Sequence, residues 1–258
     1  MRKARTLSAV ALGLALHACL CAAPAIEGSG VSATEARPVG DFDRVVVEGA
    51  VTLDLRVGGE PSCTVTTDDN LLRLVDTEVR DGALHIVTTA PVAPRTTLSV
   101  LVTTPALAAL TIRGAAEGFV RDAAGEKLEV RANGAADLTV EGLEVDRLEV
   151  RLNGAGELTA AGRADAIDIQ VAGAGTAALA ELCALTAQVR VNGAGSLKLA
   201  VAEKIEASIH GAGSIEYLGD PSAAPTVAGF GSISRGGPLP ARCAGGAAAD
   251  AGDRKSVV

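Results

Sequence analysis

Apolar and polar residues alternate in short stretches through the middle of the chain, and the alternation restarts about every 20 residues. The copies align without gaps on a central Gly-Ala pair, as in LEVRANGAADLTV from Leu128 and LEVRLNGAGELTA from Leu148. Apolar residues occupy the positions six, four and two before the glycine, and polar residues lie between them. A period of two is typical of a strand with one buried face, so each copy predicts such a strand.

A further apolar position follows four residues after each central glycine, which predicts that the chain turns at the Gly-Ala pair and begins a second wall. The expected corner glycines are Gly114, Gly134, Gly154, Gly173, Gly193, Gly211 and Gly229. The segment VVVEGAVTL offers an earlier copy at Gly49. A bend that recurs in every repeat often needs a positive φ, which glycine adopts at little cost.

A coil of about 20 residues cannot bury its apolar side alone, so successive coils must stack. The pattern therefore predicts an all-β fold, a parallel β-helix or β-solenoid over residues 39–235, with strands about 4.8 Å apart. Asn133, Asn153 and Asn192 each precede a corner glycine. We interpret them as a structural ladder of stacked amides.

The rest of the chain departs from this period. Strand-like stretches at 44–57, 63–67, 84–88 and 97–103 are separated by turn residues, which predicts an irregular N-terminal cap over the first open edge of the solenoid. Residues 26–38 are expected to be a linker. Residues 236–258 are rich in Gly, Ala and Pro and are expected to be a disordered tail.

The N-terminus has the pattern of a signal peptide over residues 1–25, because Arg2, Lys3 and Arg5 precede an apolar stretch that ends in small residues. Two processing routes stay open. Leu16-His17-Ala18-Cys19 is similar to a lipobox, with lipid attachment at Cys19, whereas Ala23-Pro24-Ala25 fits an ordinary signal peptidase. Both predict an exported protein: an outer-membrane lipoprotein, or one in the periplasm or on the cell surface.

Charge narrows the class of partner. Removing residues 1–25 takes away three positive charges and no acids, so the formal net charge moves from −8 to −11. Such an acidic chain disfavours nucleic acid and anionic lipid as partners, and leaves an N-terminal lipid as the expected membrane contact.

Cys19 and Cys21 belong to the export segment, which leaves three cysteines in the body of the chain. Cys183 and Cys243 are the pair expected to form a disulfide, which would tie the tail to the solenoid wall. The alternative is that these two and Cys63 are small buried apolar residues without a bond.

Residues 39–235 resemble a family of bacterial envelope proteins named for an auto-transporter adhesin head, the GIN domain. The resemblance rests on Phe42-Asp43-Arg44-Val45 followed by Gly49, on Asn70-Leu71-Leu72, on Pro105-Ala106-Leu107 before Leu110, and on the serial Asn-Gly-Ala-Gly corners. It implies a right-handed β-helix on an exported or lipid-anchored protein. It brings no catalytic residues.

A binding or adhesion module is the first functional hypothesis, because solenoids present long regular faces. Its most distinctive surface combines an acidic column, Glu129, Glu149, Asp168 and Glu206, with a basic column, Arg131, Arg151 and Arg190. The alternative is a solvated strip of ion pairs. The expected partner is an envelope protein or surface ligand, and self-association through the solenoid ends is a further expectation.

An enzyme that acts on polysaccharides is a rival hypothesis, and a passive envelope spacer is a third. Four aromatic residues make a sugar-stacking platform improbable, and only His85 and His210 remain after export. The chain has no Gly-x-Ser-x-Gly elbow, no His-Glu-x-x-His pair and no calcium-binding nonapeptide pattern. We therefore predict a non-enzymatic protein with no catalytic, cofactor-binding or metal-binding residues.

Overall fold

The structure is a computed structural model and describes residues 24–244. The expected lipid-attachment residue, Cys19, and nearly all of the expected signal peptide lie outside the described residues. So do residues 245–258 of the expected tail.

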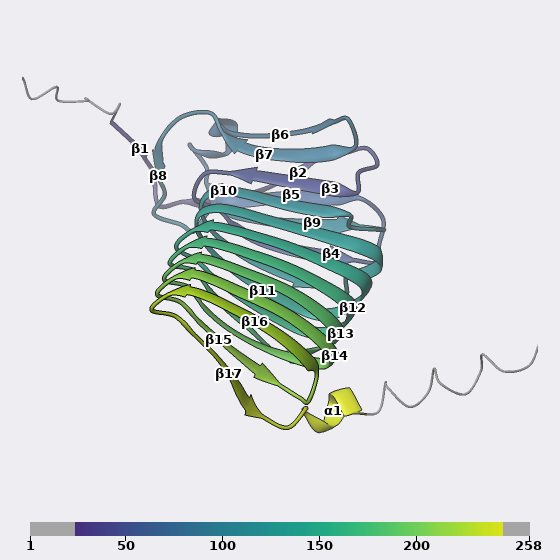
Figure 1. Ribbon diagram of the computed structural model, residues 1–258. Coiled ribbons are helices and arrows are strands. Elements are labelled where there is room, and N and C mark those ends of the chain that lie inside the picture. Colours follow the sequence, from purple (N-terminus) through teal and green to yellow (C-terminus); the bar gives the residue numbers. More distant parts are fainter. Residues whose placement is uncertain (1–23, 245–258) are drawn as a thin grey trace, which may run out of the picture.

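The chain winds into a parallel β-solenoid (Figure 1). Its coils contain β10 (Ala109–Arg121), β11 (Ala124–Gly154), β12 (Glu157–Gly173), β13 (Thr176–Gly193), β14 (Ser196–Gly211), β15 (Ser214–Leu218), β16 (Ser222–Gly229) and β17 (Ser232–Gly237). Each of β12, β13 and β14 begins on the second wall, bends, and ends on the first wall at a corner glycine. Equivalent residues pair from coil to coil, as Val150 does with Ile169 and Ile169 with Val189. The predicted fold class is confirmed.

The core lies between the walls and follows the predicted columns. From Leu128 to Ile209, every residue six, four or two positions before a corner glycine is buried. The column after the corner is buried from Leu138 to Ile215, and Ile233 in the last coil is partly buried. Small and branched side chains at these positions let strands stack closely with a continuous apolar interior.

The corner glycines form their own stack. All seven have φ between +126° and +138°, a region that other residues rarely adopt. They also pack on one another: a Cβ at Gly154 would lie 2.2 Å from the Gly134 carbonyl oxygen. Gly49 continues the stack, since a Cβ on Gly114 would lie 2.6 Å from its carbonyl oxygen. The early copy is therefore the spatial neighbour of the coil at Gly114.

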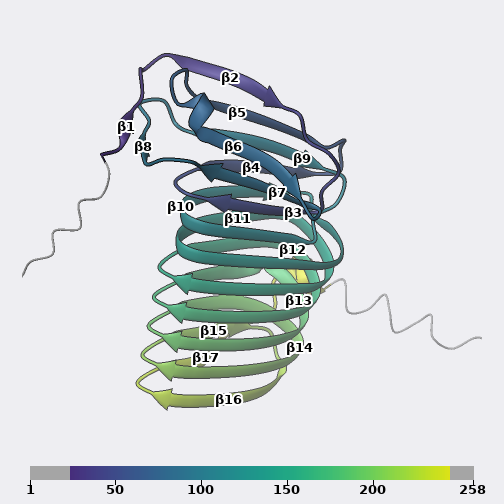
Figure 2. The ribbon, with the colours of Figure 1, turned by 90° about the horizontal axis from the view of Figure 1, so that it is seen from above.

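The N-terminal cap does not follow chain order. β3 (Arg44–Glu48) and β4 (Thr52–Val57) form a coil against β10, while β7 (Ala83–Thr88) and β9 (Ser99–Thr104) form another coil outside it. Beyond these, β5 (Ser62–Asp68) pairs with β9 and β6 (Val75–Arg80) pairs with β7, both antiparallel. A 3-10 turn, η1 (Leu72–Leu74), joins β5 to β6. The capped end is thus a mixed sheet, as Figure 2 shows at the top.

Two expectations about the flanks are wrong. Residues 26–38 are not a linker, because β1 (Ile26–Glu27) pairs with β8 (Val92–Ala93) and β2 (Ser32–Arg37) adds antiparallel to β5. β2 has only small and polar residues and is mostly exposed, so backbone pairing with a free sheet edge places it, and no apolar pattern marks it. Residues 236–244 are not disordered: β17 reaches Gly237 and α1 (Ala241–Ala244) follows.

A buried carboxylate joins the N-terminal segment to the cap. Asp68, at the end of β5, is fully buried. It accepts hydrogen bonds from the backbone N–H groups of Gly30 (2.7 Å), Arg95 (2.8 Å) and Thr96 (3.1 Å), and from the Thr96 hydroxyl (3.2 Å). Burial by itself raises the pKa of the carboxyl, but the hydrogen bonds, led by the Thr96 N–H, leave the pKa below its usual value of 3.8.

We expect Asp68→Asn to loosen β2 and the segment at residues 95–96, because an amide offers one acceptor oxygen and turns an NH₂ group toward the remaining donors. Hydrogen exchange at residues 30–37 should speed up, while exchange in β12 and β13 stays unchanged as an internal control. Since the folded pKa is depressed, the contribution of Asp68 is complete above pH 3.8 and is lost as the pH falls through the folded pKa. The wild type should therefore loosen in this acid window, and equal acid sensitivity of β2 in the variant would contradict the role of Asp68.

Candidate binding face

The outer surface of the first wall has an ion-pair strip in its middle coils, which we define as Lys127, Glu129, Arg131, Arg147, Glu149 and Arg151. Glu129 pairs with Arg131 at 2.5 Å and also with Arg151 of the next coil. Glu149 pairs with Lys127 at 2.9 Å and Arg147 at 3.1 Å. The predicted acidic and basic columns therefore meet here, and both carboxylates are enclosed by cations.

The electrostatics of the ion-pair strip are largely satisfied internally. The Lys127 ammonium at Glu149 holds the pKa of that carboxyl below its usual range, with Arg147 adding to the effect. The side chains of Glu129 and Glu149 are only 15% and 17% exposed. A ligand that competed for these carboxylates would have to break several short contacts, so the strip is a stabilising network rather than a free binding surface.

The pairing becomes looser toward the C-terminal coils. Two adjoining depressions of about 250 and 290 Å³ lie there on the first wall, and both are lined by Gln188 and Glu206. We call this surface the polar groove; its other polar lining residues are Arg147, Asp168, Thr186, Arg190, Lys204, Ser208 and Thr226. It runs from the end of β11 across β12, β13 and β14 to β16.

The polar contacts of Arg190 and Gln188 within the groove are long. Arg190 lies 3.7 Å from Asp168 Oδ1, and that oxygen is buried without a hydrogen-bond partner. Gln188 donates to Glu206 at 3.4 Å. By contrast, Lys204 lies 2.7 Å from Glu206 and lowers the pKa of that carboxyl. Arg190, Gln188 and Asp168 thus retain free hydrogen-bonding capacity, whereas the corresponding side chains of the ion-pair strip are already paired.

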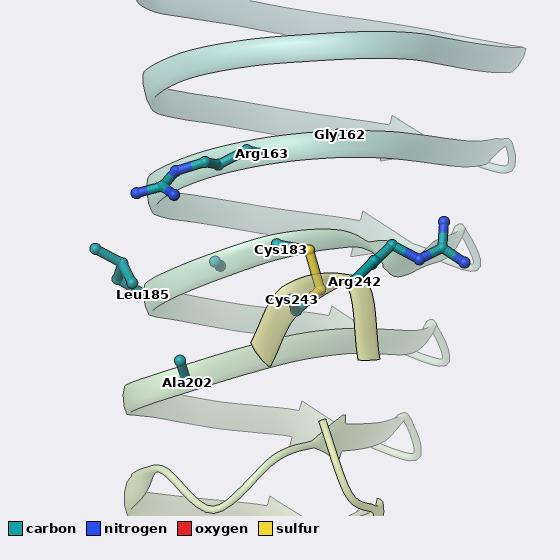
Figure 3. Close-up of a pocket in the computed structure, with 8 residues that line it drawn as sticks. Gly162, Arg163, Cys183, Leu185, Ala202, Arg242 and Cys243 are labelled. Carbon is teal, nitrogen blue, oxygen red and sulfur yellow. A yellow bond between two sulfur atoms is a disulfide. The ribbon is translucent and has the colours of Figure 1, made fainter. Parts of the chain in front are cut away.

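A third depression, of about 230 Å³, lies beneath α1 and is mainly apolar (Figure 3). Cys183 of β13 and Cys243 of α1 form a disulfide across it, with their Cα atoms 5.1 Å apart. Its two arginines point away from the disulfide and are engaged elsewhere, Arg163 with Asp165 at 3.1 Å and Arg242 with Glu181. The depression therefore marks where α1 packs against the solenoid wall.

A larger depression, about 470 Å³, lies near the cap at the corners of the first coils. Arg95, Glu117 and Asp137 supply its charged lining, and small corner residues supply much of the rest. Arg95 pairs with Glu27 at 3.1 Å, and Asp137 accepts the Glu157 N–H at 3.1 Å. The sequence pattern does not indicate this depression, because Arg95 comes from the cap.

The asparagines, histidines and the free cysteine singled out in the sequence belong to the solenoid framework or the cap. Asn153 donates to Asn133 at 2.9 Å, which is one rung of the expected ladder. His210 follows Asn192 in the same register column, whereas His85 lies on β7 in the cap. Cys63 is buried, and this burial raises the pKa of its thiol to about 11. Over residues 24–244, no three His, Cys, Asp or Glu side chains converge in a way that could hold a metal ion, and no helix is long and apolar enough to cross a membrane.

These features define the molecule as a parallel β-solenoid protein with a mixed-sheet cap and a polar first wall. The family model described as “Putative auto-transporter adhesin, head GIN domain” matches residues 41–221. The chain belongs to this family, as the resemblance in its sequence predicts.

Solved structures of similar proteins share this fold. A “putative adhesin” from Bacteroides fragilis is 20% identical, with a TM-score of 0.77 over 81% of this chain and 99% of its own. A “putative lipid binding protein” from Parabacteroides distasonis is 21% identical, with a TM-score of 0.69 over 82% and 99%. A “putative adhesin” from Parabacteroides merdae is 21% identical, with a TM-score of 0.61 over 81% and 98%. Among proteins with curated descriptions, none matches the chain.

Proposed function

We propose that this protein is a non-enzymatic adhesion or binding module of the cell envelope, which is exported and uses the polar groove to bind an envelope protein or surface ligand. Membership of an adhesin-named family and the sequence pattern of an export signal support this assignment. The observation that carries it is the contrast along the first wall. Short ion pairs close the middle coils, while long contacts leave Gln188, Arg190 and Asp168 available in the last ones.

The groove suits a polar ligand that lies along the solenoid axis. It presents donors from Arg190, Lys204 and Gln188 beside acceptors from Asp168 and Glu206, each on a rigid strand. Strand-borne groups hold their spacing of about 4.8 Å between coils, so a ligand with a regular repeat of polar groups would meet several of them at once.

The test compares binding to purified envelope fractions by the mature chain and by an Arg190→Glu/Lys204→Glu variant. Each substituted side chain is at least two-fifths exposed, so the fold should survive, and we expect retention on the envelope to fall at least about tenfold. The matched control is Arg163→Glu/Lys198→Glu, which makes the same charge change at residues whose side chains are 47% and 50% exposed. If both variants lose retention equally, the change in net charge explains the loss. If the groove variant loses no retention, the groove is not the binding surface.

A further inference from the structure

The two ends of the solenoid differ. The N-terminal end is closed by the antiparallel strands of the cap, whereas no described residue forms a strand stacked on the last coil, made by β16 and β17 (Figures 1 and 2). All eight residues of β16 are exposed, and within residues 24–244 this strand pairs with β14 alone. We call residues 222–234 the open end.

The chemistry of the open end is unusual for an exposed sheet edge. Residues 222–234 contain no charged residue, and the charges that flank them, Asp220 and Arg235, pair with each other at 3.1 Å. The strands that precede them in the stack carry several charges. Phe230 is 98% exposed and Val227 is 44% exposed. Phe230 stands directly after the corner glycine, where the regular coils have alanine. Proteins protect free edges with charges, proline or short strands. The open end has Pro225 but no charge, and its exposed Phe230 and Val227 point to a surface that another molecule covers.

Pro225 limits how the open end can be covered. Backbone N–H groups an odd number of positions from a corner glycine point to the preceding coil, as Glu129 does to Ala108 (2.9 Å) and Ala155 does to Gly134 (3.0 Å). Pro225 is four positions before Gly229, so its nitrogen is on the open side, where it cannot donate. An added strand would lack a central hydrogen bond. Side chains must therefore supply part of the contact, and regular coil-on-coil stacking is weakened.

The net charge of the chain restricts where two copies can meet. The exported chain carries a net charge of about −11, because residues 1–25 remove three positive charges from a total of −8. Two copies repel one another through their net charge, and the repulsion is smallest where they meet through an uncharged end, because no like charges are brought into contact there. An apolar end also matches itself about a two-fold axis, which gives a closed contact.

We propose that the open end is a homotypic contact, in which the last coils of two copies meet end to end through Phe230 and Val227. Ten strands lie side by side on the first wall: β6, β7, β3, β10, β11 twice, β12, β13, β14 and β16. At about 4.8 Å per strand they span roughly 43 Å. β1, the first strand of the described residues, lies at the capped end (Figure 1). This step rests on the export in the proposed function, and a chain anchored through the lipid expected at Cys19 presents the open end at the far tip.

The contact is small. An eight-residue strand is about 26 Å long and facing walls are about 10 Å apart, so the end offers roughly 300 Å², well below the ~800 Å² per partner of a standard interface. A single pair should be weak, and many copies on two facing surfaces should be needed for a lasting contact.

The experiment places mature chain with an N-terminal biotin on streptavidin beads of two colours. We expect mixed-colour clusters that increase with surface density. Phe230→Ser should reduce clustering at least about fivefold, and because its side chain is almost fully exposed the fold should be unaffected. Phe119→Ser is the matched control: Phe119 is 36% exposed on the second wall, far from the end in the strand order, and its loss should leave clustering intact.

Several results would overturn the proposal. Clustering that survives Phe230→Ser, or that falls equally with Phe119→Ser, excludes the open end as the contact. Clustering that appears only after residues 245–258 are removed shows that the chain's own tail covers the end, and Phe230-dependent binding to uncharged lipid vesicles without bead clustering shows that a membrane does. The groove variant Arg190→Glu/Lys204→Glu should still cluster, so failure of the proposed groove and failure of the homotypic contact can be told apart.

Discussion

Gly154→Ala should destabilise the protein by at least ~3 kcal/mol, the largest effect that we expect from one substitution. At φ +130° a side chain strains the backbone, and the added Cβ would lie 2.2 Å from the Gly134 carbonyl oxygen. This atom belongs to the backbone of the neighbouring coil, so it cannot rotate away. The coils would have to separate, which breaks the hydrogen bond from Ala155 N–H to the Gly134 carbonyl (3.0 Å). Urea unfolding followed by circular dichroism measures the loss.

Gly58→Ala provides the control for this prediction. Gly58 also has a positive φ, +106°, but no atom lies within 4 Å of a Cβ built on it. The Gly58→Ala variant should therefore lose only the stability that a strained backbone costs, about 1–2 kcal/mol. Equal losses at Gly58 and Gly154 would mean that backbone conformation alone explains the corner glycines and that close stacking contributes nothing.

Removing the disulfide with Cys183→Ala/Cys243→Ala should produce the second large effect. The bond closes a loop across a sequence separation of 60 residues, and the chain-entropy model assigns such a loop about 4 kcal/mol. The loop contains β14 to β17 and α1, so the loss should be concentrated in the last coils. Hydrogen exchange there should speed up more than in β10 or β11.

Chemical reduction tests the same point without a substitution. Reductant should shift the urea midpoint of the wild type toward that of the double alanine variant and leave the variant unchanged. A variant that unfolds like the oxidised wild type would show that packing of α1, and not the covalent bond, holds the last coils. A further shift of the variant in reductant would indicate a second redox-sensitive group.

The polar groove could be predicted from the sequence only in part. The acidic and basic columns were visible as residues of alternating sign, and the pairs of Glu129 with Arg131 and Arg151 follow from them. Lys127 and Arg147, which pair with Glu149, belong to neither column. The sequence did not indicate that Arg190 and Asp168 lie 3.7 Å apart while Arg131 and Glu129 lie at 2.5 Å. Such differences depend on side-chain conformations and on neutral neighbours such as Gln188, which the column pattern treats as equivalent to charged ones.

The sequence by itself determined the solenoid. Each coil repeats the same local information, apolar residues at a period of two and a glycine at the corner, so strand, corner and buried face could all be assigned without knowledge of long-range pairing. The tertiary structure alone decided the cap and the ends. The coil of β7 and β9 lies outside the coil of β3 and β4 although it comes later in the chain, and β2 joins the edge with no apolar pattern of its own. The position of each of these strands depends on which free sheet edge it pairs with. That pairing is determined by backbone hydrogen bonds between residues far apart in the sequence.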